Sequence, residues 1–297
     1  MKKGILITGA HRSGSTWTGK VISKSEQVRY VQEPFNIAIK KYKAPLKYWF
    51  EYIHRNQNKV YQDKIRTYIN GFLDPFAFKI FTKDNDKSLL KNTYTQLLEF
   101  NRKATKRSLL KDPIALLSAE WLYQSFNLDV VILIRHPAAF IASIKVKEWE
   151  FDFNNFLNQP ELMNSLLKPY REPIALYANN KHSIVDQGIL LWTILYHVVL
   201  HYQKSYSDKW YFVKHEDLSK SPIKEFEHIF KFLNVPFDQN VQQYLLKTTT
   251  SKTSTELNRD SKSNIQSWKN RLNKSEIDHI KQGTFEVWKH FYEENDW

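Results

Sequence analysis

Residues 5–20 read ILITGAHRSGSTWTGK, and this stretch decides the fold. The apolar run at residues 5–7 predicts a buried strand, and a loop rich in Gly and Ser follows it. Residues 16–23 read as the start of a helix. Because the first N–H groups of a helix lack intrahelical partners and attract negative charge, a strand, a tight loop and a helix in this order predict an anion site. An ordinary strand-to-helix turn is the alternative.

The loop is close to a nucleotide-phosphate loop without being one. The spacing Gly9-x4-Gly14-Ser15-Thr16 nearly fits GxxxxGK[ST], but Ser15 stands at the lysine position. A positive charge is found instead at Arg12, inside the loop. We interpret the loop as a phosphate cradle that is not built to hydrolyse a nucleoside triphosphate.

Composition limits the classes of protein that this chain could be. At 297 residues it can bury a core, and its net charge of +13 predicts attraction to anions, unless it reflects only a Lys-rich proteome. The absence of cysteine excludes disulfides and thiolate metal sites. The N-terminus lacks an apolar run typical of a signal peptide, and the apolar run at residues 189–200 suits a core helix better than a membrane span. We expect a soluble, cytoplasmic protein.

Strands alternate with helices along the chain, which predicts one α/β domain over residues 1–297, with a central parallel sheet of the P-loop type flanked by helices. Residues 37–107 are expected to be inserted helices and loops, residues 151–183 an irregular, mobile flap, and residues 251–264 a polar loop. Further strands are expected at residues 108–113, 129–134 and 210–214, and a short one at 78–81. Further helices are expected at residues 114–125, 136–147, 186–205 and 222–233, the last capped by Ser221, with a capping box at 275–278 opening a terminal helix.

A second anion site is predicted where the strand at residues 129–134 ends. Arg135 follows this strand directly, and Ser143 comes eight residues later on the next helix. Arginine presents a planar fork that matches phosphate, and a serine hydroxyl adds one donor. Two phosphate sites imply a ligand with two separated anionic groups, although Arg135 could also pair locally.

Four motifs along the chain resemble, in their order, those of the P-loop sulfotransferases that use 3′-phosphoadenosine 5′-phosphosulfate (PAPS). They are most similar to the motifs of the bacterial, carbohydrate and tyrosylprotein members. HRSGSTW at residues 11–17 resembles the 5′-phosphosulfate loop, and ILIRHP at 132–137, with Ser143, resembles the 3′-phosphate motif. VKHEDL at 213–218 is similar to the YEDL element, and QSWK at 266–269 to the WK element. The resemblance implies PAPS as sulfuryl donor, its bisphosphate PAP as product, and no metal.

The resemblance also implies roles for individual residues. Arg12 matches a catalytic cation that stabilises charge on the bridging oxygen, and Trp17 matches an aromatic that packs on adenine. The 3′-phosphate would be bound by Arg135 and Ser143. Further contacts to the nucleotide are implied for Ser13, Gly14, Ser15, Thr16 and, in the WK element, Ser267.

A base for the acceptor hydroxyl is expected at Glu33. QEP at residues 32–34 resembles the Glu-bearing element of carbohydrate and tyrosylprotein sulfotransferases, and such a base needs partial burial. Lys111, in KDP at 111–113, resembles a lysine that assists the leaving phosphate. A surface charge or cap at Glu33, and a solvated Lys111, are the alternatives.

Some features depart from the family pattern. His215 stands where the YEDL element has Tyr, and the Arg-Lys-Gly loop of cytosolic members is missing, although residues 251–262 could replace it. We interpret His11 and His136, which flank the two sites, as loop residues.

The acceptor is expected to be a small molecule or glycan with a hydroxyl, above all a saccharide, and anionic saccharides are included. Residues 37–107 and 151–183 are expected to contact it. A lipid head group, a tyrosine or a phenol also fits; no nucleic-acid partner is expected, and the oligomeric state is open. One alternative is a P-loop phosphotransferase such as a kinase, which requires Lys at position 15 and an acidic Mg²⁺ ligand at a strand end, and neither is evident. Another is a non-catalytic, basic polyanion-binding protein.

Overall fold

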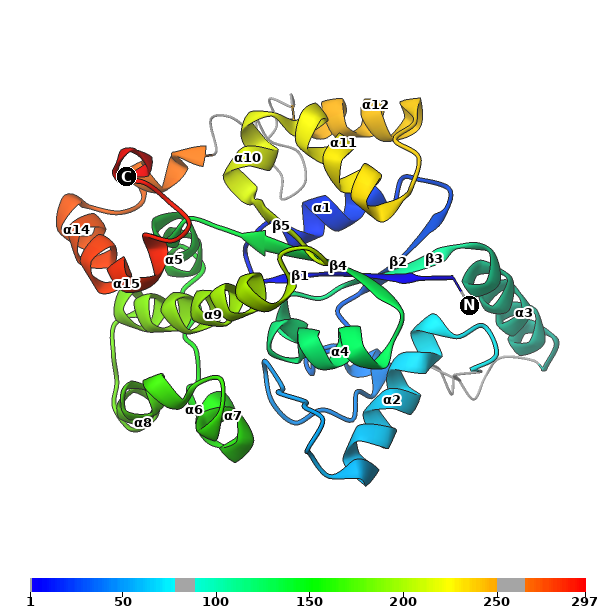
Figure 1. The fold of residues 1–297 in the computed structure, drawn as a ribbon, viewed down its shortest axis with the longest axis horizontal. Helices are drawn as coiled ribbons and strands as arrows, with labels where there is room; N and C mark the ends of the chain where they lie inside the picture. Colours follow the sequence, from blue (N-terminus) through cyan, green and yellow to red (C-terminus); the bar gives the residue numbers. More distant parts are fainter. Residues whose placement is uncertain (1, 78–88, 250–264) are drawn as a thin grey trace.

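The computed structural model describes residues 2–77, 89–249 and 265–297, in which five parallel strands form one sheet in the order β2-β3-β1-β4-β5 (Figure 1). β4 is buried along its whole length, as its apolar run predicts for a central parallel strand. The predicted α/β class and parallel sheet are confirmed. The strands are β1 (Gly4–Gly9), β2 (Val28–Gln32), β3 (Arg107–Lys111), β4 (Leu128–Ile134) and β5 (Tyr211–Lys214).

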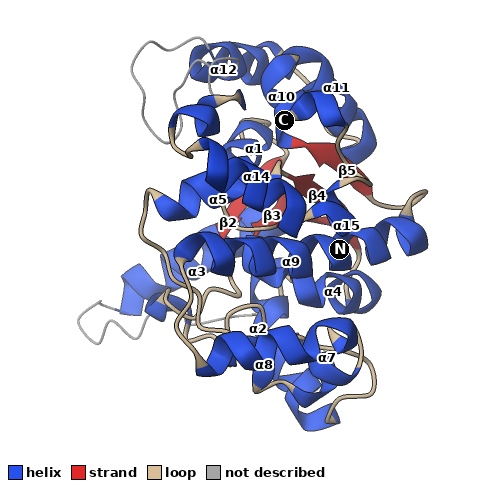
Figure 2. Cartoon of the chain, turned by 90° about the vertical axis from the view of Figure 1, so that its left-hand side faces the viewer, coloured by secondary structure: helices blue, strands red, loops and turns tan. Residues whose placement is uncertain are grey.

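Helices cover both faces of the sheet, and each face has its own apolar core (Figures 1 and 2). On one face lie α1 (Ser15–Ile22), α10 (His215–Lys220), α11 (Pro222–Leu233) and α12 (Gln239–Thr249). On the other lie α2 (Lys59–Leu73), η2 (Pro113–Ser118), α4 (Ala119–Ser125), α5 (Pro137–Lys145) and α9 (Ile184–Tyr206), with η1 (Lys40–Tyr42) before α2 and α3 (Leu89–Thr105) before β3. The C-terminal segment adds η4 (Ser267–Asn270), α14 (Lys274–Gly283), α15 (Phe285–Trp288) and η5 (Glu294–Asp296).

The long apolar helix α9 lies in the larger core. Among the described helices it alone has the length and composition of a membrane span, and 61% of its most apolar window is buried inside the fold. Trp192 and Tyr196 on this helix are fully buried. This placement agrees with the core helix predicted at residues 186–205.

The carboxyl ends of β1 and β4 form the switch point of the sheet. These two strands are neighbours, but β1 leads into α1 on one face and β4 into α5 on the other. Ile22 of α1 belongs to the smaller core, whereas Phe140 of α5 belongs to the larger one. Because the two connections diverge, the region outside these strand ends is the place where open α/β sheets bind ligands.

The prediction of irregular structure at residues 151–183 is wrong, whereas the predicted mobility of this segment is not tested and stays a prediction. Short helices follow one another here, anchored by buried Phe153, Phe156 and Leu162. Each has nine residues or fewer, too short for a helical period to show in the sequence. They are α6 (Asn154–Leu157), α7 (Pro160–Asn164), η3 (Lys168–Tyr170) and α8 (Arg171–Asn179).

Other differences are local. The edge strand β2 was not predicted, because VRYVQ does not alternate strictly in hydrophobicity. The helix predicted at 114–125 divides into η2 and α4. α14 has the capping box, but Asn273 rather than Ser275 is its cap, and Ser221 precedes α11 without a side-chain cap bond. The predictions for residues 78–81 and 251–264 lie outside the described residues.

Candidate active site

The turn between β1 and α1 forms the predicted phosphate loop. Its backbone is left-handed at Arg12 (φ 64°) and at Gly14 (φ 90°), the residue that precedes α1. A Cβ at position 14 would lie 2.4 Å from Nδ1 of His215, so both conformation and space require glycine. The N–H groups at the start of α1 lack intrahelical partners, which makes them donors for an anion.

Arg135 leaves the sheet at the end of β4, in a backbone position fixed by α9. Its N–H donates to the Tyr196 hydroxyl over 2.8 Å, and its carbonyl accepts a hydrogen bond from Nε1 of Trp192 over 2.9 Å. The Arg135 guanidinium donates through Nη1 to the carbonyl oxygen of Arg12. The aromatic core helix therefore aims this cation at the phosphate loop.

Arg12 and Ser143, predicted to serve two different anionic groups, are in direct contact. Nε of Arg12 donates to the Ser143 hydroxyl over 2.9 Å, and Ser143 is buried on α5. Together with the Arg135 bond to the Arg12 carbonyl, this joins the two predicted phosphate sites into one basic cluster. Arg12 and Arg135 are 123 positions apart in the sequence, and the pairing of β1 with β4 brings them together.

The remaining residues of the loop differ in exposure. Ser13 and Ser15 are buried, while Thr16 is exposed. The Ser13 hydroxyl has no hydrogen-bond partner within the described part of the chain. A buried hydroxyl of this kind needs a hydrogen-bond partner, and an anion bound in the loop would accept its hydrogen bond.

Trp17 lies at the junction of α1 with α11 and α12. Its ring is edge-on to Phe226, with centroids 5.1 Å apart, and its Nε1 donates to the Thr248 hydroxyl over 3.2 Å. His215, the residue that departs from the YEDL pattern, packs on the same ring with centroids 6.1 Å apart. The adenine contact of Trp17 stays a prediction.

Glu33 and Lys111 form an ion pair on the other side of the loop, with side chains 17% and 1% exposed. Lys111 is therefore not solvated, and Glu33 is not an isolated surface charge. The Glu33 carboxylate also accepts from Nδ2 of Asn36 over 2.7 Å. A Cβ at Gly19 would lie 3.1 Å from Cγ of Lys111, so this glycine lets the lysine stem pass α1. The catalytic roles of both residues stay predictions.

Asp112, which sequence reasoning quoted but did not assign, braces the turn that carries Glu33. Its buried carboxylate accepts from the N–H groups of Phe35 (2.5 Å) and Ile114 (3.1 Å). Burial, and then the charge of Glu33, raises the pKa of Asp112 to about 7, against these two hydrogen bonds and Lys111. An acid does therefore follow a strand, contrary to our sequence reading, but both its oxygens accept backbone N–H groups. Its place directly after a strand was the available signal.

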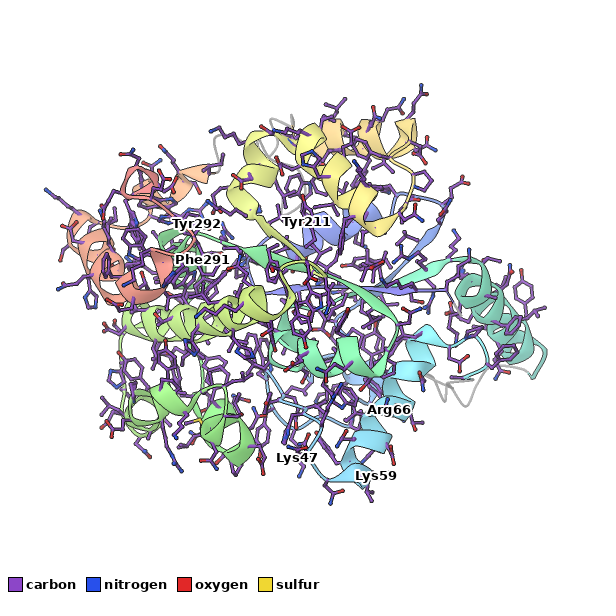
Figure 3. The ribbon with its side chains drawn as sticks, in the orientation of Figure 1. Lys47, Lys59, Arg66, Tyr211, Phe291 and Tyr292 are labelled. Carbon is purple, nitrogen blue, oxygen red and sulfur yellow. The ribbon has the colours of Figure 1, made fainter. Side chains whose placement is uncertain are left out.

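The C-terminal segment reaches the Arg135 side through Glu216. Its carboxylate accepts from the His136 N–H and from the hydroxyl of Tyr292, labelled in Figure 3, each over 3.0 Å. Trp268 stacks on the His136 ring with centroids 5.2 Å apart. Ser267, beside it in η4, is half-buried, and its nucleotide contact stays a prediction. Burial, reinforced by nearby cations, lowers the pKa of His136 to about 3, so the ring is neutral and packs.

The two predicted acceptor segments meet beside the phosphate loop. The N–H of Trp49 donates to Oδ1 of Asn155 over 2.9 Å, and the N–H of Tyr52 to Oε1 of Gln159 over 2.8 Å. His11 packs between Phe50 and Phe140, and burial followed by the Arg12 charge lowers its pKa to about 4. These contacts build one aromatic wall from distant segments.

Sequence and structure comparisons identify the family. A profile of the Sulfotransferase family matches residues 4–239, whereas no curated protein matches the chain. The sulfotransferase domain from the curacin biosynthetic pathway is 16% identical, with a TM-score of 0.51 over 99% of each chain. That of the Synechococcus PCC 7002 olefin synthase is 14% identical, with a TM-score of 0.51 over 98% of this chain and 97% of that one. At such identities the solved structures show the shared fold. The family match covers most of the chain, and the protein therefore belongs to the sulfotransferase family, enzymes that in general transfer a sulfuryl group from PAPS.

Proposed function

We propose that this sulfotransferase binds PAPS at the carboxyl ends of β1 and β4 and sulfates a saccharide hydroxyl, with Glu33 as the base. The observation that carries the proposal is the joined cluster of Arg12, Arg135 and Ser143 at the switch point of the sheet. Two cations and the start of α1 suit a ligand with two anionic groups. The buried hydroxyl of Ser13 adds a donor that has no partner among the described residues.

The donor contacts follow from this arrangement. The N–H groups and hydroxyls of residues 13–16 hold the 5′-phosphate, while Arg135 and Ser143 hold the 3′-phosphate. The hydrogen bond between Arg12 and Ser143 places the residues assigned to the two groups close together, as one ligand that carries both groups requires. Trp17, beside the same loop, and Ser267 complete the nucleotide contacts.

Sulfuryl transfer needs positioning and charge stabilisation more than covalent catalysis by the protein. An acceptor oxygen forms its bond to sulfur as the bond from sulfur to the bridging phosphate oxygen breaks, and the electron pair stays on that oxygen. Arg12 stabilises the charge that develops there, and Glu33 takes the acceptor's proton. Lys111, bonded to the Glu33 carboxylate, orients this base and assists the leaving phosphate.

The proposal of a saccharide acceptor is based on the residues of this chain. The aromatic segments around Phe50 and Asn155 adjoin the phosphate loop. Phe50 itself is buried, but Trp49 and Tyr52 beside it are partly exposed, and aromatic faces pack on sugar rings. The solved relatives are named for curacin biosynthesis and an olefin synthase, and neither name refers to a sugar.

Calorimetric binding of PAP, ADP and ATP–Mg²⁺ tests the proposal. We expect micromolar or tighter binding of PAP alone. A preference for ATP–Mg²⁺ would instead indicate a phosphotransferase, and binding of none of the three would favour a non-catalytic polyanion-binding protein. After PAP binding is established, sulfation of saccharides and phenols from PAPS compares the acceptor classes.

A further inference from the structure

We propose that Trp149, with Val146 beside it, binds the CH-rich face of a ring in the acceptor, either a pyranose or an aryl ring. The inference rests on the proposed function, because Arg12 is assigned there to the reacting group. It adds a subsite for the acceptor and names the chemistry that this subsite recognises.

The first observation is the position of Trp149. The guanidinium carbon of Arg12 lies 5.4 Å from the centroid of its ring, within the range of a cation–π contact. The same guanidinium bonds Ser143, so Trp149 borders the basic cluster directly. A molecule that contacts the exposed part of this indole therefore lies close to Arg12.

The second observation is exposure at this place. Trp149 is 45% exposed and Val146 59%, whereas Phe50 and Phe140 behind them are fully buried. The His11 ring connects the buried rings to Trp149, with centroids 6.2 Å apart. Single exposed apolar residues are ordinary. This ring differs because it forms the open end of an aromatic cluster that contacts the proposed catalytic cation.

The third observation is that the backbone holds Trp149 in place. Glu148 has a left-handed conformation (φ 51°), and the N–H of Trp149 donates to the Ile144 carbonyl over 3.1 Å. This is the closing pattern of a helix end, with Glu148 at the position where glycine is usual. Two residues later the N–H of Phe151 donates to Oε1 of Gln187 over 2.9 Å. The backbone that carries the ring is therefore held at Trp149 itself and two residues later.

The acceptor fits this position better than the adenine of the donor. Trp17, the predicted adenine contact, packs in the smaller core with Phe226 of α11. Trp149 instead follows α5 and contacts His11, which packs on Phe140 of the larger core. In Figure 1 the segment after α5 runs to α6, away from α11 and α12. A flat indole offers a ring face both dispersion and favourable CH contacts with its π-system.

The test uses PAP-saturated protein and ligand-observed NMR titration. Methyl β-glucopyranoside and 4-nitrophenol serve as the two ring probes, and sorbitol as the acyclic control. We expect Trp149→Ala to lower the affinity for the preferred ring probe by about tenfold. Trp149→Phe should lower it by less, since a phenyl ring still stacks. Phe285→Ala, at an aromatic residue that is 44% exposed on α15, is the matched control and leaves binding unchanged.

The outcomes separate this inference from the proposed function. Preference for the glucoside or for 4-nitrophenol identifies the source of the ring. The inference is overturned if neither probe binds the wild type, if sorbitol binds equally well, or if Trp149→Ala binds as the wild type does. Weaker PAP binding by Trp149→Ala also overturns it, because the ring would then belong to the donor site. Loss of the proposed function would appear differently, as a wild type that does not bind PAP.

Discussion

The site has two halves that differ in construction. The β1–β4 half consists of helix starts and cations joined by hydrogen bonds, with Arg12 bonded to Ser143 and Arg135 bonded to the loop. The β2–β3 half depends on one ion pair, Glu33 with Lys111, whose lysine is almost fully buried. The first half can bind anions through local backbone geometry. The second requires correct packing, because a charge buried without its partner is strongly destabilising.

The comparison extends to the backbone. Near the ion pair, Glu33 itself has a left-handed conformation (φ 48°), and its N–H donates to the Lys111 carbonyl over 2.8 Å. Asp112 holds the next residues through Phe35, and the Tyr68 hydroxyl donates to the Pro34 carbonyl over 2.7 Å. Two separate segments, the end of β3 and α2, thus hold the turn that carries this carboxylate. We infer that the two halves can be disabled independently, and the predictions below test this.

Glu33→Gln should have the largest effect, and this effect should fall on turnover and not on donor binding. Without a carboxylate to accept the proton, we expect kcat to fall by roughly 10²–10⁴-fold, the usual contribution of a general base. PAP affinity, measured by calorimetry, should stay nearly unchanged. Glu26→Gln, at an exposed carboxylate just before β2, is the matched control. Normal turnover in Glu33→Gln, with an unchanged melting temperature, would remove Glu33 as the base.

Arg12→Ala should have the second-largest effect, and it tests a residue of the β1–β4 half that is assigned to the reacting group. Loss of the cation beside the bridging oxygen is expected to lower kcat by about 10²–10³-fold, the cost of removing one charge-stabilising donor. Steady-state kinetics with saturating PAPS measure this effect. Lys231→Ala, at an exposed cation on α11 outside the site, should behave as the wild type does. Equal kinetics for the two variants would contradict the role of Arg12.

Arg135→Ala should show the opposite pattern to Glu33→Gln, with its effect on donor binding. We expect PAP affinity to fall by about 1.5–3 kcal/mol, or roughly 10–150-fold, which is typical of a hydrogen bond to a charged group. Calorimetric titration of PAP gives the value. An affinity unchanged within error would mean that the 3′-phosphate binds elsewhere and that the division into halves is wrong.

Asp112→Asn should produce the smallest effect, a change in the pH dependence of stability. The pKa of Asp112 is raised in the folded protein to about 7, above its usual 3.8, so the folded state binds this proton more tightly than the unfolded state does. Its contribution to stability is therefore complete below about pH 4 and decreases as the pH rises toward 7.

Urea unfolding of both proteins between pH 4 and 8 measures this contribution. The wild type should lose stability relative to Asp112→Asn as the pH rises toward 7, because the amide resembles the protonated carboxyl at every pH. The difference should be constant above that pH. Parallel curves for the two proteins over the whole range would show that Asp112 is not protonated in the folded state.

The sequence predicted the residues of the β1–β4 half better than the contacts of the β2–β3 half. The phosphate loop at Gly9–Gly14 and Arg135 after its strand follow from short motifs, because the start of a helix is a local structure. The ion pair of Glu33 and Lys111 joins residues 78 positions apart, and its existence depends on the pairing of β2 with β3. The edge strand β2 was not predicted at all, so this contact could not be predicted either.

The sequence by itself determined the fold class and the anion-binding character, because apolar strands, Gly-containing turns and helix starts are encoded over a few neighbouring residues. Only the tertiary structure decided which of these elements became neighbours. It paired β1 with β4 and thereby brought Ser143 to Arg12, buried Lys111 against Gly19 and placed Trp149 over the Arg12 guanidinium. Such contacts depend on sheet order and on side-chain packing over long sequence separations, which no local pattern in the chain specifies.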